Sequence, residues 1–250
     1  MQNDPLPTIS VITICKNTKD TIERALQSVT ESKYPHLQYV VVDGGSTDGT
    51  LDIIDRYRTS LHKFISEPDR GISDALNKAI SLTDGEYHIT VHADDKLLPG
   101  ALETLGSIAA RTKAQVVCGS AAVVDGDKVM KVFLSDPSKL TRKMSIPHMG
   151  ALIRKQAWES IGGYDLRKRI AMDHLFMLKL LHRYGPQGFA VVDAVVATYS
   201  LGGLSDRFIQ QGFREVRDNL IEEGMSPIEA NWAYQLLLIK LQVSKLLGRK

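Results

Sequence analysis

The stretch YVVVDGGSTDGTLDIIDRY, residues 39–57, decides the fold. Its first four residues are apolar and β-prone, and they lead into Asp43, a pattern that predicts a buried strand ending at a carboxylate. The glycine-rich GGSTDG that follows is typical of a turn. Leu51, Ile54 and Tyr57 then recur at helical spacing, so the stretch predicts a strand, a turn and an amphipathic helix.

Similar units lie on both sides of this stretch. The β-branched run Ile9–Cys15 predicts a strand, and the helix expected after it has Asn17 as its N-cap. Residues 63–66 predict a short third strand, and Tyr87–Val91 predict a fourth that ends at HADD. Strands alternating with helices indicate right-handed βαβ units, and therefore an α/β fold with a mostly parallel sheet flanked by helices.

The regular alternation of strands and helices stops after about residue 115. QVVCG, SAAVV and VMKVF predict strands with hairpin connections, followed by a helix through Trp158, a helix over 173–182 and a strand over 189–199. From about residue 206 the pattern is helical, with a break near Gly224 and Pro227. We expect one compact domain over residues 1–205. The helical extension over 206–250 would pack on that domain, on a partner or on a membrane surface.

Composition excludes several classes of protein. The 250 residues are 43% hydrophobic and 24% charged, enough for one sizeable core, which excludes a disordered chain. The net charge of +2 gives no case for nucleic-acid binding. Cys15 and Cys118 lie in β-prone runs, which favours buried free thiols in a reducing compartment. Without a leader or a long apolar run, the expectation is a soluble, cytoplasmic protein.

Carboxylates follow two of the predicted strands. Asp43 ends one strand, and Asp94 and Asp95 follow another, so all three would line the crevice at the carboxyl ends of the sheet. Such a pair suits Mg²⁺ or Mn²⁺, which would offset the repulsion between the acids and a nucleotide diphosphate. The alternative is that Asp43 caps a turn and that Asp94 and Asp95 open the next helix. The dinucleotide and P-loop glycine motifs are absent, and Asp48 breaks the serine-hydrolase pattern.

Six blocks of sequence, in order from about Thr8 to Leu204, carry a resemblance to a known family. They resemble the family 2 glycosyltransferases, which have the GT-A fold and act in bacterial surface polysaccharide biosynthesis. The blocks are PTISVITICKN, VVVDGGSTDGT, SEPDRGISDALNKAI, GEYHITVHADDKLLPGAL, IPHMGALIRKQAWESIGGYD and IAMDHLF.

The resemblance implies a role for five residues. Asp43 matches the carboxylate that accepts a hydrogen bond from the uracil of a UDP-sugar, and Arg70 is similar to a basic residue near the donor nucleotide. Asp94 would lie near the ribose and donor sugar, and Asp95 would ligate the divalent metal. Asp173 matches the general base of an inverting transfer, although by its residue type it could equally be a helix N-terminal acid.

Three positions depart from the family pattern. His92 stands where many relatives have the first Asp of D-x-D, which leaves the metal contact less defined. Lys16 replaces an aromatic residue near the nucleobase, and Asp173-His174 replaces the commoner Glu-Asp. His148 resembles a position on the acceptor side but is expected to be structural, and Trp158 is expected in the core.

The acceptor is predicted to be a glycan or a lipid-linked saccharide. Residues 131–170 hold nine basic and three acidic side chains, a face that could meet an acceptor diphosphate or an anionic membrane, or simply be solvated. The Leu-rich C-terminus could lie on the inner membrane face, pack on the domain or form a homodimer. The alternative functions are a non-catalytic sugar-nucleotide-binding scaffold and a metal-dependent nucleotide-sugar hydrolase.

Overall fold

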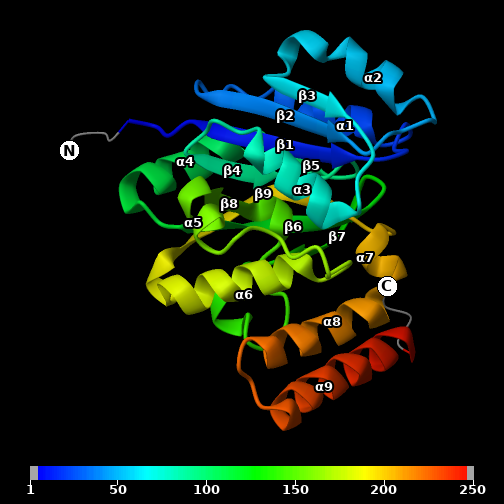
Figure 1. Ribbon diagram of the computed structural model, residues 1–250, viewed down its shortest axis with the longest axis vertical. Helices are drawn as coiled ribbons and strands as arrows, with labels where there is room; N and C mark the ends of the chain where they lie inside the picture. The colour runs from blue at the N-terminus through cyan, green and yellow to red at the C-terminus, as the bar shows by residue number, and fades with distance from the viewer. Residues whose placement is uncertain (1–4, 247–250) are drawn as a thin grey trace.

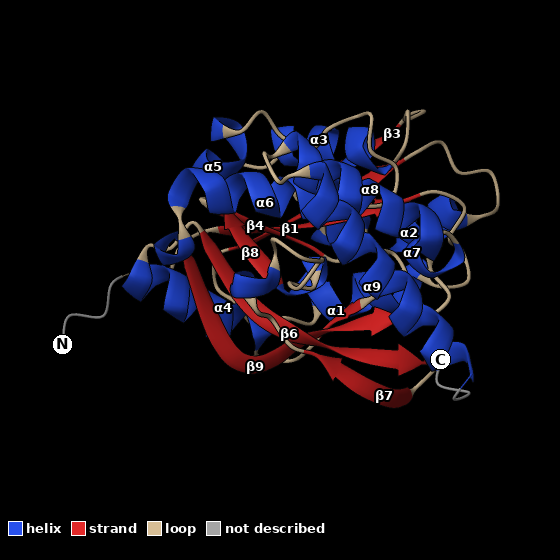
Figure 2. Ribbon diagram, turned by 90° about the horizontal axis from the view of Figure 1, so that it is seen from below, coloured by secondary structure: helices blue, strands red, loops and turns tan. Residues whose placement is uncertain are grey.

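A curled, mixed sheet runs through the computed structural model, which describes residues 5–246 (Figures 1 and 2). Its strands in the described range are β1 (Ile9–Cys15), β2 (Leu37–Asp43), β3 (Lys63–Ser66), β4 (Tyr87–Thr90), β5 (Lys96–Leu97), β6 (Val116–Asp125), β7 (Lys128–Phe133), β8 (Ala151–Arg154) and β9 (Phe189–Ser200). They are ordered β3-β2-β1-β4-β8-β6-β9-β5, and β7 pairs with β6 at the side.

The first half of the sheet is parallel, as the sequence predicts. Strands β3, β2, β1 and β4 all run in one direction, and β6 and β9 pair in parallel further along. The expected α/β fold with a mostly parallel sheet is confirmed. Two elements were not expected, namely β8, which is inserted antiparallel between β4 and β6, and the two-residue β5, which pairs with β9. Residues 116–125 form one continuous strand where two were predicted.

Helices cover both faces of the sheet. Helices α1 (Ile22–Thr30), α2 (Thr50–Arg56) and α4 (Ala101–Thr112) pack on one face, and α3 (Ile72–Ser81), α5 (Lys155–Ser160) and α6 (Met172–Tyr184) pack on the other. Short 3-10 turns cover Arg58–Ser60, Pro137–Lys139, His148–Gly150 and Pro186–Gly188. Successive side chains of a strand point to opposite faces, so Val41 joins the first core while Val40 and Val42 join the second.

The structure decides two local predictions, one about the cysteines and one about a helix cap. Cys15 and Cys118 are buried free thiols, as expected. The prediction that Asn17 caps the first helix was wrong, because Thr21 occupies the N-cap position. Asn17 instead adopts a left-handed backbone conformation with φ 53°, which asparagine tolerates, and its side-chain oxygen accepts a hydrogen bond from the Thr47 amide at 2.9 Å.

Three helices follow β9, namely α7 (Leu204–Arg207), α8 (Ile209–Glu222) and α9 (Pro227–Leu246). In Figure 1, α6 lies between the sheet and the α8–α9 pair. Val216 and Leu220 of α8 share a small apolar cluster with Ala171 and Leu178 at α6, and Ala230 of α9 completes it. Within the part of the chain that the structure describes, no helix is both long and apolar enough to cross a bilayer.

Candidate active site

Asp43 organises the loop between β2 and α2. Its buried carboxylate accepts hydrogen bonds from the backbone amides of Gly45 (3.0 Å) and Ser46 (2.9 Å) and from the hydroxyls of Ser66 (2.7 Å) and Ser46 (2.5 Å). Burial alone would raise the pKa of Asp43, but these hydrogen bonds outweigh it and lower the pKa. The Cys15 thiol also lies 3.6 Å from Oδ1. A thiol is a weak hydrogen-bond donor, so the serine hydroxyls and the two amides are the main partners of this carboxylate.

Asp94 and Asp95 follow β4, and the loop after β9 closes over them. The Ser200 amide donates to Asp95 Oδ1 at 2.8 Å, and the Ser200 hydroxyl donates to the Asp94 carbonyl at 2.5 Å. Asp94 remains partly exposed, while Asp95 is 3% exposed. Burial and the neighbouring Asp94 charge both raise the pKa of Asp95 well above its usual value. The alternative that these acids open the next helix is wrong, since β5 and Pro99 come before α4.

The same loop leaves little room for a side chain at Gly203. A Cβ there would lie 3.1 Å from Asp94 Oδ2, so the backbone approaches the acids closely. Among the described residues no group of three or more His, Cys, Asp or Glu forms a ready metal cage. Two adjacent carboxylates nevertheless fit Mg²⁺ or Mn²⁺, which usually take one or two carboxylates and complete their shell with phosphates and water. Burial first, and the Asp94 charge second, disfavour the charged form of Asp95, and a cation bound at the pair would favour it.

His92, which departs from the family pattern, belongs to a buried polar chain. Its Nε2 lies 3.2 Å from Nδ1 of His148, and His148 Nε2 lies 2.7 Å from the Tyr164 hydroxyl. The Tyr164 ring in turn stacks on Phe176 of α6, with ring centroids 4.3 Å apart. Burial, and then the nearby His92 and His88 rings, lower the pKa of His148 well below its usual value. The expectation that His148 has a structural role fits these contacts.

Arg70 lies in the loop between β3 and α3. Its guanidinium is 3.2 Å from Asp74 Oδ1, and its side chain is 76% exposed. It lines a cavity of about 200 Å³ together with Lys168, Arg169 and Ile170. Lys168 is paired with Glu222 at 2.7 Å. Arg70 and Lys168 thus each have a carboxylate partner, and Arg169 is the cation among the described lining residues for which the structure shows none within 4.0 Å.

Asp173 is the second residue of α6. Burial raises its pKa to about 6, against the lowering effect of the His174 amide, which donates to Oδ1 at 2.8 Å. The start of this helix is held from outside by Glu215 of α8, whose Oε2 accepts from the amides of Arg169, Ile170 and Ala171 at 3.2, 2.9 and 2.9 Å. His174 is buried against the Leu140 carbonyl at 2.9 Å.

The structure brings only some of the predicted site residues together. Asp43 ends β2 and Asp94 follows β4, and β1 lies between those two strands, so the acids share one edge of the sheet. Within residues 5–246, no hydrogen bond or ion pair joins Asp173 to Asp43, Arg70, Asp94 or Asp95. Sequence reasoning missed Ser200, Gly203 and Glu215. The glycine pair in SLGGLS was the one local signal of a close backbone approach.

Comparisons with known proteins agree with this architecture. A family model described as "Glycosyl transferase family 2" matches residues 10–176. A PGL/p-HBAD biosynthesis glycosyltransferase of Mycobacterium bovis is 29% identical over 223 residues, which cover 83% of this chain and 82% of that protein. TuaG of Bacillus subtilis, named for teichuronic acid biosynthesis, is 32% identical over 139 residues, with 54% and 55% covered.

Two solved structures share the fold. A mannosyltransferase of Pyrobaculum calidifontis, crystallised with GDP-Man and Mn²⁺, has a TM-score of 0.72 and 21% identity, covering 97% of this chain and 76% of that one. TarS of S. aureus in complex with UDP-GlcNAc has a TM-score of 0.67 and 18% identity, covering 92% and 71%. The match includes β2, which ends at Asp43, and β4, which Asp94 and Asp95 follow. The chain therefore belongs to glycosyl transferase family 2 and is a glycosyltransferase.

Proposed function

We propose that the chain moves a sugar from a nucleotide-sugar donor to an acceptor hydroxyl, with inversion at the anomeric carbon. The observation that supports this most directly is the Asp94–Asp95 pair at the carboxyl end of β4, held beneath the β9–α7 loop by Ser200. Ligands bind beyond this edge in open α/β sheets. A single base and a site for the departing diphosphate are sufficient for such a transfer.

A UDP-sugar is the proposed donor. In this arrangement the uracil lies at the end of β2 beside Asp43, and Asp94, after β4, lies at the ribose and donor sugar. Arg70, in the β3–α3 loop beside the Asp43 loop, has a largely exposed side chain and would contact the donor. TarS was crystallised with UDP-GlcNAc and the Pyrobaculum mannosyltransferase with GDP-Man. The first experiment should therefore compare uridine and guanosine nucleotides as ligands of this chain.

Asp95 is the proposed metal ligand, with Asp94 beside it. A bound Mn²⁺ or Mg²⁺ would stabilise the negative charge on the leaving diphosphate. Ser200 fixes one oxygen of Asp95, which orients the carboxylate without neutralising it. The Mn²⁺ in the archaeal mannosyltransferase is consistent with this assignment.

Asp173 is the proposed general base. With a pKa of about 6 it is ionised at neutral pH, yet basic enough to accept a proton from a hydroxyl that is becoming a nucleophile. The acceptor oxygen then forms a bond to the anomeric carbon, the bond to the diphosphate breaks, and the proton stays on Asp173. Glu215 has a positioning role, because it fixes the start of α6.

The proposed setting is cell-surface polysaccharide assembly, with a glycan or lipid-linked saccharide as acceptor. TuaG is named for such a pathway. We also propose peripheral contact with the inner membrane face through the outer side of α9, which exposes Ile228, Trp232, Leu236, Ile239, Val243 and Leu246. Residues 206–250 are then an extension of the transferase unit formed by 1–205. Alternatively, a second copy of the chain would pack against this apolar side of α9 and form a homodimer.

Nucleotide binding with and without Mn²⁺ tests the donor site. We expect UDP with Mn²⁺ to raise the melting temperature of the wild type and not of Asp95→Asn, which keeps the acceptor for the Ser200 amide while removing the charge. Asp193→Asn, an exposed change on β9, is the matched control. If no nucleotide stabilises the wild type, the donor site is wrong. Nucleotide binding without sugar transfer to any acceptor would indicate the non-catalytic sugar-nucleotide-binding scaffold. Release of free sugar from the nucleotide sugar would indicate the hydrolase.

A further inference from the structure

The polar chain formed by His92, His148 and Tyr164 joins three segments that are distant in the sequence. His92 follows β4 and comes just before the loop that carries Asp94, His148 begins a 3-10 turn, and Tyr164 lies between α5 and α6. The ring centroids of His92 and His148 are 5.4 Å apart, and those of His148 and Tyr164 are 5.7 Å apart. One end of the polar chain therefore lies near a proposed donor residue, and the other end lies at the helix that carries the proposed base.

The backbone of Tyr164 is fixed independently of its hydroxyl. Asn77 of α3 donates from Nδ2 to the Tyr164 carbonyl at 2.8 Å, and its Oδ1 accepts from the Tyr164 amide at 2.9 Å. The preceding residue, Gly163, has φ 78°, and a Cβ there would lie 2.8 Å from Asn77 Oδ1, so this approach requires glycine. A change confined to the Tyr164 hydroxyl therefore breaks the polar chain while the loop stays anchored to α3.

The Tyr164 ring contacts the part of α6 that carries Asp173. It stacks on Phe176 with a centroid distance of 4.3 Å and an interplanar angle of 20°. Phe176 comes three residues after Asp173, and residues at this spacing are neighbours on a helix surface. Burial first, and the Asp173 charge second, raise the pKa of the Tyr164 hydroxyl well above its usual value, which agrees with this proximity. The fixed tyrosine ring is thus a support for the first turn of α6.

Other contacts hold the start of α6 from different directions. Glu215 of α8 accepts from the amides that lead into the helix, and the His174 ring is hydrogen-bonded to the Leu140 carbonyl at 2.9 Å. Neither contact reaches the strand that leads to the proposed donor acids. The polar chain adds a support from that strand, because His92 comes directly after β4.

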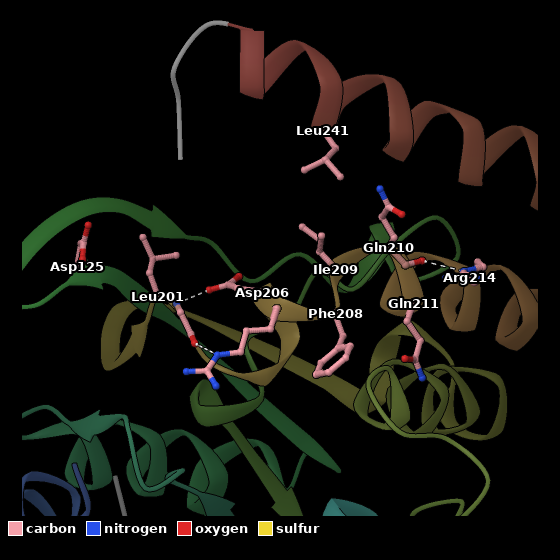
Figure 3. Close-up of a pocket in the computed structure, with 11 residues that line it drawn as sticks. Asp125, Leu201, Asp206, Phe208, Ile209, Gln210, Gln211, Arg214 and Leu241 are labelled. Carbon is pink, nitrogen blue, oxygen red and sulfur yellow. Dashed lines mark hydrogen bonds between the residues drawn. The ribbon is translucent and has the colours of Figure 1, made fainter. Parts of the chain in front are cut away.

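The loop over the donor acids has contacts of its own. Asp206, which lines an open cavity of about 720 Å³ between α9 and the α7–α8 segment (Figure 3), accepts from the Gly202 amide at 2.8 Å. Arg207 donates from Nε to the Gly202 carbonyl at 3.0 Å. The next residue, Gly203, is the one that approaches Asp94 closely. Because these contacts do not involve the polar chain, we expect this loop to keep its place when the polar chain is broken.

We propose that His148 and Tyr164 are positioning residues for the general base Asp173. They hold the first turn of α6 in a fixed place relative to the loop that carries Asp94. This rests on the proposed function, because it gives a role to residues that touch neither the donor nor the acceptor. A base displaced by about 1 Å can lose about 100-fold in rate, so a support of this kind acts on turnover and leaves nucleotide binding unchanged.

Amide hydrogen exchange of the full chain, followed by NMR at Leu175 and Phe176, tests the support without any substrate. Tyr164→Phe keeps the ring on Phe176 and removes the hydroxyl, and it should speed exchange at these two amides by about five-fold, as expected for one lost hydrogen bond. His148→Leu should have the same effect. His148→Gln retains polar atoms that can pair with the hydroxyl, so it should lie closer to the wild type. Glu215→Ala is the positive control, because it removes a known support of the same helix start.

The kinetic readout is release of UDP from UDP-GlcNAc with Mn²⁺, with water as the acceptor. Tyr164→Phe and His148→Leu should each lower kcat by about ten-fold or more, with the KM for UDP-GlcNAc unchanged. The double variant should be no slower than the slower single variant, because both changes break the same link. His148→Gln should recover part of the lost kcat. A raised KM with kcat unchanged would overturn the proposal, because it would place these residues in donor binding.

Tyr87→Phe is the matched control for a buried tyrosine hydroxyl. Tyr87 is 1% exposed, it belongs to the core on the opposite face of the sheet, and its hydroxyl donates to the Ala114 carbonyl at 2.9 Å. This variant should lower the melting temperature about as much as Tyr164→Phe, yet leave kcat and the exchange of the α6 amides unchanged. The proposal is overturned if Tyr164→Phe and His148→Leu lower the melting temperature but affect α6 exchange no more than Tyr87→Phe does.

Nucleotide binding keeps this test separate from that of the proposed function. UDP with Mn²⁺ should stabilise Tyr164→Phe and His148→Leu as much as the wild type, since neither changes Asp43, Asp94 or Asp95. Unchanged α6 exchange in variants that still bind UDP would overturn the positioning role alone. Absence of nucleotide binding in the wild type would instead overturn the proposed donor site. If the wild type binds UDP but does not cleave UDP-GlcNAc, the exchange pattern decides the proposal by itself.

Discussion

Replacing Asp173 with asparagine is expected to make the protein more stable at pH 7.5. Burial raises the pKa of Asp173 from its ordinary 3.8 to about 6. One pKa unit corresponds to about 1.36 kcal/mol, so the ionised carboxylate costs the folded state up to about 3 kcal/mol. Asparagine keeps the acceptor for the His174 amide and loses the attraction of a charge to the helix N-terminus, about 0.3–1 kcal/mol. The net gain is about 2 kcal/mol, or about 4–8 °C in melting temperature.

The pH dependence identifies the cause. Because the pKa of Asp173 is higher in the folded state, the folded state binds this proton more tightly, and wild-type stability falls as pH rises from about 4 through about 6. Asp173→Asn lacks this term, so its advantage should be largest above pH 7 and vanish near pH 4. Scanning calorimetry from pH 4 to 8 measures it, with the exposed Asp193→Asn as control. A difference that does not change with pH, or a less stable variant at pH 7.5, refutes the burial argument.

Three further outcomes follow from the same region. Turnover of Asp173→Asn should fall by about 10²- to 10⁴-fold in a transfer assay while nucleotide binding in a thermal-shift assay is unchanged. In the wild type, kcat/KM should rise with pH through about 6, because the base must be ionised; a flat pH–rate profile would argue against Asp173 as base. Glu215→Ala should cost about 1–3 kcal/mol in denaturant unfolding, since three amides of the α6 start lose their acceptor, whereas the exposed Glu159→Ala should change little.

The parts of the fold that local patterns encode could be predicted. The strand ending at Asp43 and the helix with Ile54 on its inner side are visible as a change from continuous apolar residues to helical spacing. The positions of Asp43, Asp94 and Asp95 at strand ends follow from the same pattern. Each of these features depends on residues that are close together in the sequence.

Features that depend on distant pairing could not be predicted. Strand β8 inserts antiparallel between β4 and β6 because of its partners, and its own four residues are equally compatible with other neighbours. The Ser200 amide reaches Asp95 across 105 residues, and a serine near a glycine pair carries no sign of that contact. The His92–His148 pair is likewise made by two segments 56 residues apart.

The domain boundary expected at residue 205 separates α6 from α8, although α8 holds the segment at the start of α6. Glu215 of α8 accepts from three amides at the start of α6, and Asn219 donates to the Ala171 carbonyl at 2.9 Å. Removing α8 would leave these amides without their present acceptor just ahead of Asp173. The segment that leads into α6 would then lose the hydrogen bonds that fix it, and the proposed base at the second residue of that helix would lose its fixed position relative to a hydroxyl. From the contacts of α8 we propose that the catalytic unit includes residues past 205, at least as far as Glu222, whose carboxylate pairs with Lys168.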